Sequence, residues 1–358
     1  YELHGFGGNY CFGIESPVTD FTLTTLRQAW VRTEATIDLW EPENDNEDPN
    51  SPDWDALRAS DQDGSELRNE FLLGQRIARM ELPSVASTWI LPNWLCEGPP
   101  QPRHIGLRRV PRENWDELAE CVTTYLLYAK EQYGYEPDLY SFNESDIGVR
   151  LLVTAEEHRD LIKVLGARFE AAGLRTRLLL GDTGNARGTH EFCLPTAEDP
   201  EAMRYVGAIS FHSWGGASPE QYGQWRDLAR RLGLPLLVAE LGVDAGAWRT
   251  NAFDTAEYAI REAAHYIELL NYAQPQGTMQ WEFTSDYGIA KVHEGRVEPT
   301  IRYRFVEQFC NHTPYHSTVV RTASHHPKVL VAAITGEKGA FALHLVNQGA
   351  AREATLQG

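Results

Sequence analysis

The feature of this chain that most restricts its fold is a regular alternation of strand-like and helix-like segments between residues 5 and 310. The strand-like runs are short and rich in aliphatic and aromatic residues, and longer amphipathic runs separate most of them. Such alternation is typical of parallel strands joined by crossover helices. The predicted strands are 5–14, 29–39, 84–91, 137–143, 176–181, 206–212, 235–241 and 277–283.

The helix-like runs complete this pattern. One of them is framed by a capping box at Thr154 and Glu157 and by a terminating glycine at Gly173. Eight strands with intervening helices predict a (β/α)8 barrel over residues 1–313. The predicted helices are 65–81, 112–133, 154–172, 219–231, 252–270 and 300–310.

The pattern changes after Pro314. Three short alternating runs, 316–323, 329–335 and 340–346, are separated by turn residues and carry no helical periodicity. We therefore expect a small antiparallel, sandwich-like β region over residues 314–358. Its partner strands come either from the N-terminal segment or from chain outside this sequence.

The charge of the chain restricts its partners. A formal net charge of −19, from 32 basic and 51 acidic residues, disfavours nucleic acid and anionic membranes as partners. No apolar run approaches the roughly 18 residues that a membrane span requires. Because the sequence begins at Tyr1, a removed leader is one reading, so secreted, periplasmic and cytoplasmic locations all stay open. The oligomeric state is not predicted.

The five cysteines are widely spaced. No CxxC or CxxH pair suggests a zinc site, and we expect most of them to be small buried hydrophobic residues.

Two glutamates carry the main functional signal. Glu144 and Glu240 follow apolar runs at the ends of the fourth and seventh predicted strands. The carboxyl ends of barrel strands meet at the face where barrel enzymes hold their active sites. Two facing carboxyl groups are what cleavage of a glycosidic bond requires, one to protonate the leaving oxygen and one to attack or activate water. We expect burial and a negative neighbour to keep Glu144 protonated, and hydrogen-bond donors to keep Glu240 ionised.

With their companions, these residues resemble a known group. Asn143-Glu144 on strand four, Glu240 on strand seven, an aromatic residue on strand eight and the opening Gly5-Phe6-Gly7-Gly8 are similar to clan A glycoside hydrolases, most like families 30 and 39 and their relatives. The resemblance implies a (β/α)8 barrel with Glu144 as acid/base and Glu240 as nucleophile. It also implies that Asn143 hydrogen-bonds the sugar 2-hydroxyl and that Arg32 and His212 lie beside the nucleophile. Trp281 would be the aromatic platform under the sugar.

Two residues depart from the family pattern and leave the substrate open. Ser145 stands where a proline usually follows Asn-Glu, and Glu282 stands where a small residue is common. Trp214 and Trp94 are further candidates for the substrate groove. We interpret Asp182 as the cap of a turn over residues 181–184, with a site carboxylate as the alternative.

Two other functions fit parts of the pattern. A divalent-metal sugar isomerase or epimerase would use Glu144, Asp182, His212 and Glu240 as ligands for Mn²⁺, Mg²⁺ or Co²⁺. The eighth strand that follows Glu240 argues against it, because the metal barrels that resemble this pattern take their last ligand from strand eight. A non-catalytic carbohydrate-binding barrel is the second alternative.

The acidic loop 41–55 is expected to be solvated, with Ca²⁺ binding left open because its oxygen-rich sequence lacks the EF-hand spacing.

The sequence thus predicts a retaining O-glycoside hydrolase that degrades a neutral, β-linked oligo- or polysaccharide and needs no metal or organic cofactor. The sugar, the linkage and the choice between internal and terminal attack stay open. Long loops at 41–64, 92–111 and 182–204 favour terminal attack.

Overall fold

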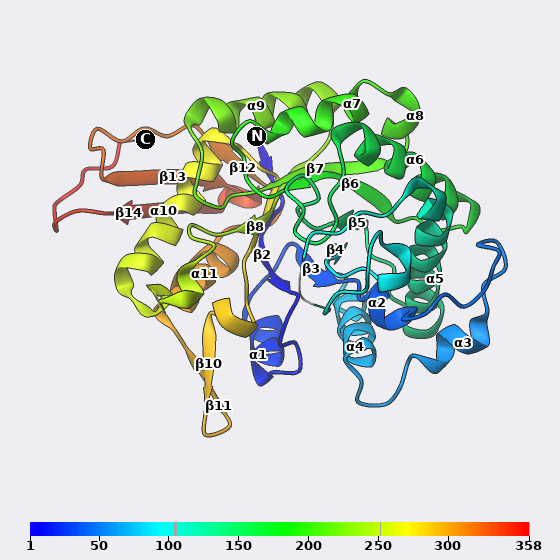
Figure 1. Cartoon of the computed structure of the whole chain (residues 1–358). Helices are drawn as coiled ribbons and strands as arrows, with labels where there is room; N and C mark the ends of the chain where they lie inside the picture. The colour runs from blue at the N-terminus through cyan, green and yellow to red at the C-terminus, as the bar shows by residue number, and fades with distance from the viewer. Residues whose placement is uncertain (104–105, 251, 358) are drawn as a thin grey trace.

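A closed barrel of eight parallel strands forms the centre of the computed structural model, which describes residues 1–103, 106–250 and 252–357 (Figure 1). Each strand pairs with the next along the chain, and the last pairs with the first. The predicted (β/α)8 fold is therefore confirmed. The barrel strands are β2 (Gly5–Tyr10), β3 (Val31–Glu34), β4 (Ser84–Thr88), β5 (Leu139–Phe142), β6 (Arg177–Thr183), β7 (Val206–His212), β8 (Leu236–Leu241) and β9 (Gly277–Gln280).

Helices surround this barrel (Figure 1). The α-helices are α1 (Pro17–Thr25), α2 (Ile37–Trp40), α3 (Trp54–Ala59), α4 (Glu66–Arg79), α5 (Trp115–Tyr133), α6 (Ala155–Ala171), α7 (Leu194–Ala197), α8 (Pro200–Met203), α9 (Pro219–Leu232), α10 (Ala256–Tyr272) and α11 (Ile301–His312). Short 3-10 turns are η1 (Asn93–Leu95), η2 (Arg112–Asn114), η3 (Thr189–Cys193), η4 (Ala247–Arg249), η5 (Ala252–Asp254), η6 (Ser285–Tyr287) and η7 (Glu337–Gly339). The capping box predicted at Thr154 is present at the start of α6.

Several predicted strands are shorter than expected, and the second differs most. The run 29–39 forms β3 only as far as Glu34, and α2 takes its second half. Trp40 at the end of α2 is fully buried, lies 4.7 Å from the Tyr128 ring centroid of α5, and donates to Thr124 Oγ1 at 3.0 Å. The run 29–39 mixes apolar with polar and charged residues, so its pattern does not separate a strand from a short buried helix, and the packing of Trp40 against α5 favours the helix.

The glycines of the first strand permit close approach of neighbouring groups. A Cβ atom at Gly7 would lie 1.7 Å from the Trp30 carbonyl oxygen, and one at Gly8 would lie 2.4 Å from the Phe283 ring. Side chains at these positions would therefore push β2 away from the elements beside it.

The barrel interior changes character along its axis. Apolar strand residues such as Val85, Leu139, Leu179 and Leu237 form one buried cluster inside the barrel. Toward the carboxyl ends of the strands the buried side chains are polar, including Arg32, Asp182, His212 and Glu240. Buried polar groups require partners, so this end of the barrel is where a functional site is expected.

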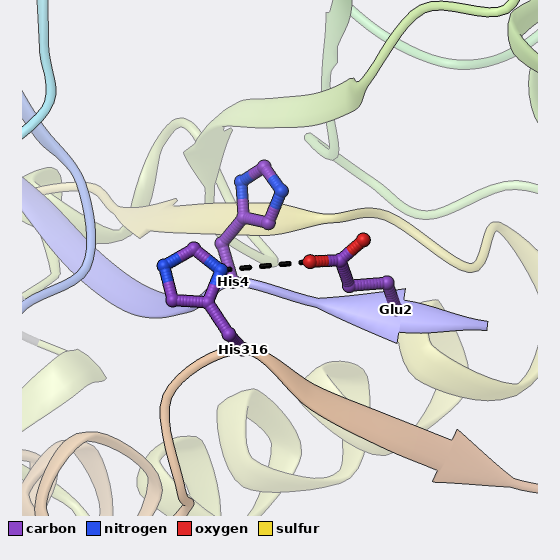
Figure 2. Close-up of side chains that lie close together, drawn as sticks. All are labelled: Glu2, His4 and His316. Carbon is purple, nitrogen blue, oxygen red and sulfur yellow. Dashed lines mark ion pairs between the residues drawn. The ribbon is translucent and has the colours of Figure 1, made fainter.

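The C-terminal region forms a second, antiparallel sheet in the order β1-β12-β13-β14. Its strands are β1 (Glu2–Leu3), β12 (Ser317–Val320), β13 (Val329–Thr335) and β14 (Phe341–Asn347). The N-terminal segment thus supplies one strand, and at this junction Glu2 and His4 lie beside His316, whose Nδ1 is 3.5 Å from Glu2 Oε1 (Figure 2). The division at residue 313 into two domains stays a prediction.

A hairpin that the sequence analysis did not foresee, β10 (Ala290–His293) with β11 (Arg296–Pro299), projects from the barrel before α11 (Figure 1). All five cysteines are buried and unpaired, as the sequence analysis expects of small hydrophobic residues. Within the described ranges, no helix combines the length and apolar character needed to cross a membrane.

Candidate active site

The carboxyl ends of five barrel strands bring one buried polar cluster together. β3 contributes Arg32, β6 contributes Asp182, β7 contributes His212 and β8 contributes Glu240, while Glu144 follows β5. In the barrel register His212 lies opposite Glu240 on adjacent strands. Each of these residues is at most 8% exposed. Their charges therefore interact in a medium of low polarity, where electrostatic interactions are stronger than in water.

Arg32 lies at the centre of the cluster. Its Nη1 donates to Glu240 Oε1 at 2.8 Å and its Nη2 to Asp182 Oδ2 at 2.8 Å. Nη2 also donates to Asn143 Oδ1 at 2.8 Å, and Nη1 to Asn9 Oδ1 at 3.2 Å. A single fully buried guanidinium thus fixes two carboxylates and the Asn143 amide. The pairing of Arg32 with the candidate nucleophile agrees with what the resemblance implies.

His212 links the three acids. Its Nδ1 lies 2.9 Å from Glu144 Oε1 and 3.1 Å from Glu240 Oε2, and its Nε2 lies 2.9 Å from Asp182 Oδ1. Burial lowers the pKa of His212, but the negative charges of Glu240 and Asp182 outweigh it, so the pKa stands well above its usual value. His212 is therefore an imidazolium that donates both N–H groups to carboxylates.

The prediction for Asp182 is wrong in its preferred form. Its carboxylate does not cap a turn. It is fully buried and also accepts from Ser141 Oγ at 2.7 Å, besides its bonds to Arg32 and His212. These partners hold its pKa below the usual range against the effect of burial. Its position among the candidate site residues agrees with the alternative, a site carboxylate. Sequence reasoning favoured the turn because Gly181 and Gly184 flank this residue.

The backbone is unusual at two of the acids. Glu144 has φ 45° and Asp182 has φ 51°, both in the left-handed region that side-chain-bearing residues seldom adopt. The two are joined, because Glu144 N donates to Asp182 O at 3.0 Å. Strain of this kind costs on the order of 1 kcal/mol or more and concentrates at functional sites, where the surroundings hold it in place.

The two glutamates differ in protonation. Burial raises the pKa of Glu144, and the charges of Glu240 and Asp146 add to that effect against the opposing contribution of His212. For Glu240, burial is outweighed by His212 and Arg32, so its pKa is lowered. Glu144 and Glu240 carboxylate oxygens lie within 4.8 Å of each other. The surroundings thus favour the protonated form of Glu144 and the ionised form of Glu240.

Aromatic rings line the same end of the barrel. Trp281, which follows β9, lies 5.8 Å from Trp89 and 6.1 Å from Phe12, measured between ring centroids. Trp214 donates from Nε1 to Glu240 Oε2 at 2.9 Å, so both oxygens of Glu240 are held. Trp89 covers the Arg32 guanidinium at 4.3 Å and was missed by the sequence analysis. Its position directly after β4 is the signal that could have identified it.

The structure does not bring Trp94 to this cluster. Its Nε1 donates to the Glu41 carbonyl oxygen at 2.9 Å, and its ring packs against the core between barrel and helices. Among the described residues, its contacts are therefore those of a structural side chain.

The two departures from the family pattern are buried beside the site. Ser145 is fully buried, and its carbonyl oxygen accepts from Val153 N at 3.1 Å. Glu282 is 2% exposed, and burial, reinforced by Glu240, raises its pKa well above the usual value. A second protonated carboxyl group therefore lies near the candidate nucleophile.

Three groups of side chains within the described ranges have a spacing that could hold a metal ion. Glu144, His212 and Glu240 form one of them. There, Arg32 and the His212 imidazolium already neutralise the carboxylates, so a divalent cation would meet two positive charges. The other two groups are Glu41 with Asp45 and Glu120, and Glu2 with His4 and His316.

Comparison with known proteins agrees with this architecture. No family model and no curated protein sequence matches the chain. Solved structures do match. A family 30 endoxylanase from Clostridium papyrosolvens C71 is 18% identical, with a TM-score of 0.71 over 94% of this chain and 79% of that one.

Two further structures are similar to the same degree. SrfJ from Salmonella typhimurium is 15% identical, with a TM-score of 0.71 over 95% of this chain and 81% of that one. An endo-β1,6-glucanase is 15% identical, with a TM-score of 0.70 over 97% of this chain and 84% of that one. At such identities the likeness establishes the fold. The chain therefore has the fold of these family 30 structures, an eight-stranded barrel with a second sheet, as its sequence resemblance implies.

Proposed function

We propose that this protein is a retaining O-glycoside hydrolase in which Glu240 is the nucleophile and Glu144 the acid/base. The observation that carries the proposal is the pair itself. Two buried carboxyl groups within 4.8 Å have pKa values shifted in opposite directions at the mouth of the barrel. Retaining glycosidases hold their carboxyl groups about 5 Å apart, whereas inverting enzymes need more than about 6.5 Å to admit a water.

In the first step Glu240 attacks the anomeric carbon while Glu144 donates its proton to the departing glycosidic oxygen. The glycosyl–Glu240 ester that forms is neutral. The charge of Glu240, which adds to burial in raising the pKa of Glu144, is then gone, so this pKa falls and Glu144 can act as the base. In the second step Glu144 takes a proton from water, the water oxygen attacks the anomeric carbon, and Glu240 leaves as a carboxylate.

The surrounding residues orient this pair. Arg32, Trp214 and His212 hold the Glu240 carboxylate through both oxygens, which fixes its direction of attack. The resemblance assigns the sugar 2-hydroxyl to Asn143, whose Oδ1 is held by Arg32 so that its Nδ2 can donate to substrate. Trp281 supplies an apolar ring face for the sugar.

The substrate class follows from charge and from the similar structures. A chain with a net charge of −19 favours a neutral saccharide. The similar proteins include an endoxylanase and an endo-β1,6-glucanase, which supports a β-linked polysaccharide such as a xylan or glucan as substrate.

The metal-dependent isomerase is the weaker alternative. The oxygens of Asp182 and Glu240 that do not bind Arg32 are already engaged, Asp182 Oδ1 by His212 and Glu240 Oε2 by Trp214 and His212. A metal ion would have to displace these hydrogen bonds and would lie beside the buried Arg32 guanidinium, which is unfavourable. The presence of both glutamates, with pKa values shifted in opposite directions by their surroundings, argues against the non-catalytic binder.

The test is hydrolysis of aryl β-glycosides and of neutral glucans, xylans, galactans and mannans by wild type, Glu144→Gln and Glu240→Gln. Glu298→Gln, an exposed glutamate on β11, is the matched control. We expect reducing sugar from wild type and control, with a loss of at least 10³-fold in the Glu240 variant. Enzyme treated with a chelator is also assayed for sugar isomerisation with and without added Mn²⁺, which distinguishes an isomerase from a hydrolase. Sugar isomerisation restored by Mn²⁺, without hydrolysis, would overturn the proposal.

A further inference from the structure

A second cluster of acidic side chains lies where the chain leaves α2. Glu41 follows α2, Asp45 belongs to the loop after it, and Glu120 reaches the same place from α5. One carboxylate oxygen from each of the three lies within 4.8 Å of the others. Asn46 is adjacent, with Nδ2 donating to Glu120 Oε1 at 3.0 Å and to Asp45 Oδ1 at 2.5 Å.

The cluster lacks the partners that buried acids require. Glu41 is 1% exposed, and neither of its carboxylate oxygens has a hydrogen-bond partner among the described residues. Three further side-chain oxygens are also buried without a partner: one carboxylate oxygen of Glu120, one of Glu117 on the preceding turn of α5, and the side-chain amide oxygen of Asn46. Unpartnered buried carboxylates are costly, and a bound cation is one way in which a native fold stabilises several that lie together.

We propose that Glu41, Asp45 and Glu120 bind a divalent calcium ion, with Glu117 and the Asn46 carbonyl at hand to complete the oxygen ligands. All these ligand atoms are hard oxygens, which suit Ca²⁺. They disfavour Zn²⁺ and Cu²⁺, which prefer nitrogen and sulfur ligands. Several carboxylates from a loop and a helix also match the large, flexible shell of Ca²⁺ better than the strict octahedron of Mg²⁺.

The ion is structural and separate from the catalytic cluster. It joins the start of the acidic loop to α5. The Trp94 indole binds the backbone carbonyl oxygen of Glu41 and leaves its carboxylate to the cluster. None of the residues Arg32, Glu144, His212 and Glu240 is among the ligands. The site does not depend on the proposed hydrolase function.

The experiment is calcium titration of the full chain after removal of metals by a chelator. We expect one equivalent of Ca²⁺ in isothermal titration calorimetry. In thermal unfolding we expect a rise in Tm of about 5 °C at a hundredfold excess over Kd. Glu41→Gln and Glu120→Gln each lose the binding and the calcium-dependent rise.

The matched control is Glu43→Gln, which replaces an exposed glutamate in the same loop. This variant is expected to keep both calcium binding and the calcium-dependent rise in Tm. Without calcium, Glu41→Gln is expected to be at least as stable as wild type, because it removes a repelled carboxylate, so a folded variant is available for the comparison. Absence of calcium binding to the metal-free wild type overturns the proposal. So does calcium binding that survives unchanged in both glutamine variants.

Discussion

The substitution Glu34→Gln is expected to change how stability depends on pH. Glu34 ends β3 and is 2% exposed, and its Oε1 has no hydrogen-bond partner among the described residues. Burial, with the charge of Asp38 added, raises its pKa to about 8. In the unfolded chain the pKa returns to about 4.5.

The sign follows from linkage. A group whose pKa is raised by folding contributes stability below its unfolded pKa and loses that contribution as pH rises toward the folded value. Each pKa unit is worth about 1.4 kcal/mol. Between pH 5 and pH 8 Glu34 ionises in the unfolded chain but largely keeps its proton in the folded one, so the free energy of unfolding should fall by about 3 kcal/mol. Glutamine does not titrate and escapes this loss.

The assay is urea unfolding of wild type and Glu34→Gln at several pH values between 5 and 8, with the exposed Glu298→Gln as control. The quantity of interest is the difference in free energy of unfolding between variant and wild type at each pH. Any effect of the glutamine side chain on stability that does not depend on pH leaves the pH dependence of this difference unchanged. The difference should grow in favour of Glu34→Gln as pH rises. A difference that is flat, or that grows in favour of wild type, refutes the reasoning.

Three predictions concern the active site. The profile of kcat/KM against pH should be bell-shaped, falling at low pH as Glu240 gains a proton and at high pH as Glu144 loses one; Glu144→Gln should abolish the alkaline limb on aryl glycosides with good leaving groups. Arg32→Lys should lower kcat by about 10²-fold or more and reduce the free energy of unfolding by about 3 kcal/mol, because lysine cannot bridge both Glu240 and Asp182. Steady-state kinetics and urea unfolding measure these two effects. An unchanged kcat would contradict the prediction. Asp182→Asn should lower the pKa of His212 by removing one of the charges that raise it, which a titration of the imidazole by NMR would detect as a shift to lower pH.

The fold and the centre of the site were predictable because both depend on local patterns. Strand-like runs that alternate with helices specify the barrel. A glutamate directly after an apolar run specifies a carboxylate at the carboxyl end of a strand, as for Glu144 and Glu240.

What the sequence missed depends on contacts between distant segments. The flanking glycines of Asp182 indicated a turn, but three side chains from other strands make it a site carboxylate. Trp94 and Trp89 both follow β4, and only tertiary packing directs one ring to the Glu41 backbone and the other onto Arg32. The acidic loop was expected to be solvated. Part of it remains exposed, while Glu41 is buried because Trp40 beside it packs against α5.

The most direct test of the central claim is chemical rescue of Glu240→Ala and Glu144→Ala by azide on an aryl β-glycoside that the wild type cleaves. If Glu240 is the nucleophile, azide takes its place in the first variant and gives an α-glycosyl azide. In the second variant, azide attacks the glycosyl–Glu240 ester and gives the β-glycosyl azide. The account predicts this pair of products, identified by the anomeric proton in NMR. The opposite pair, or α product from both variants, would contradict the assignment of the two glutamates.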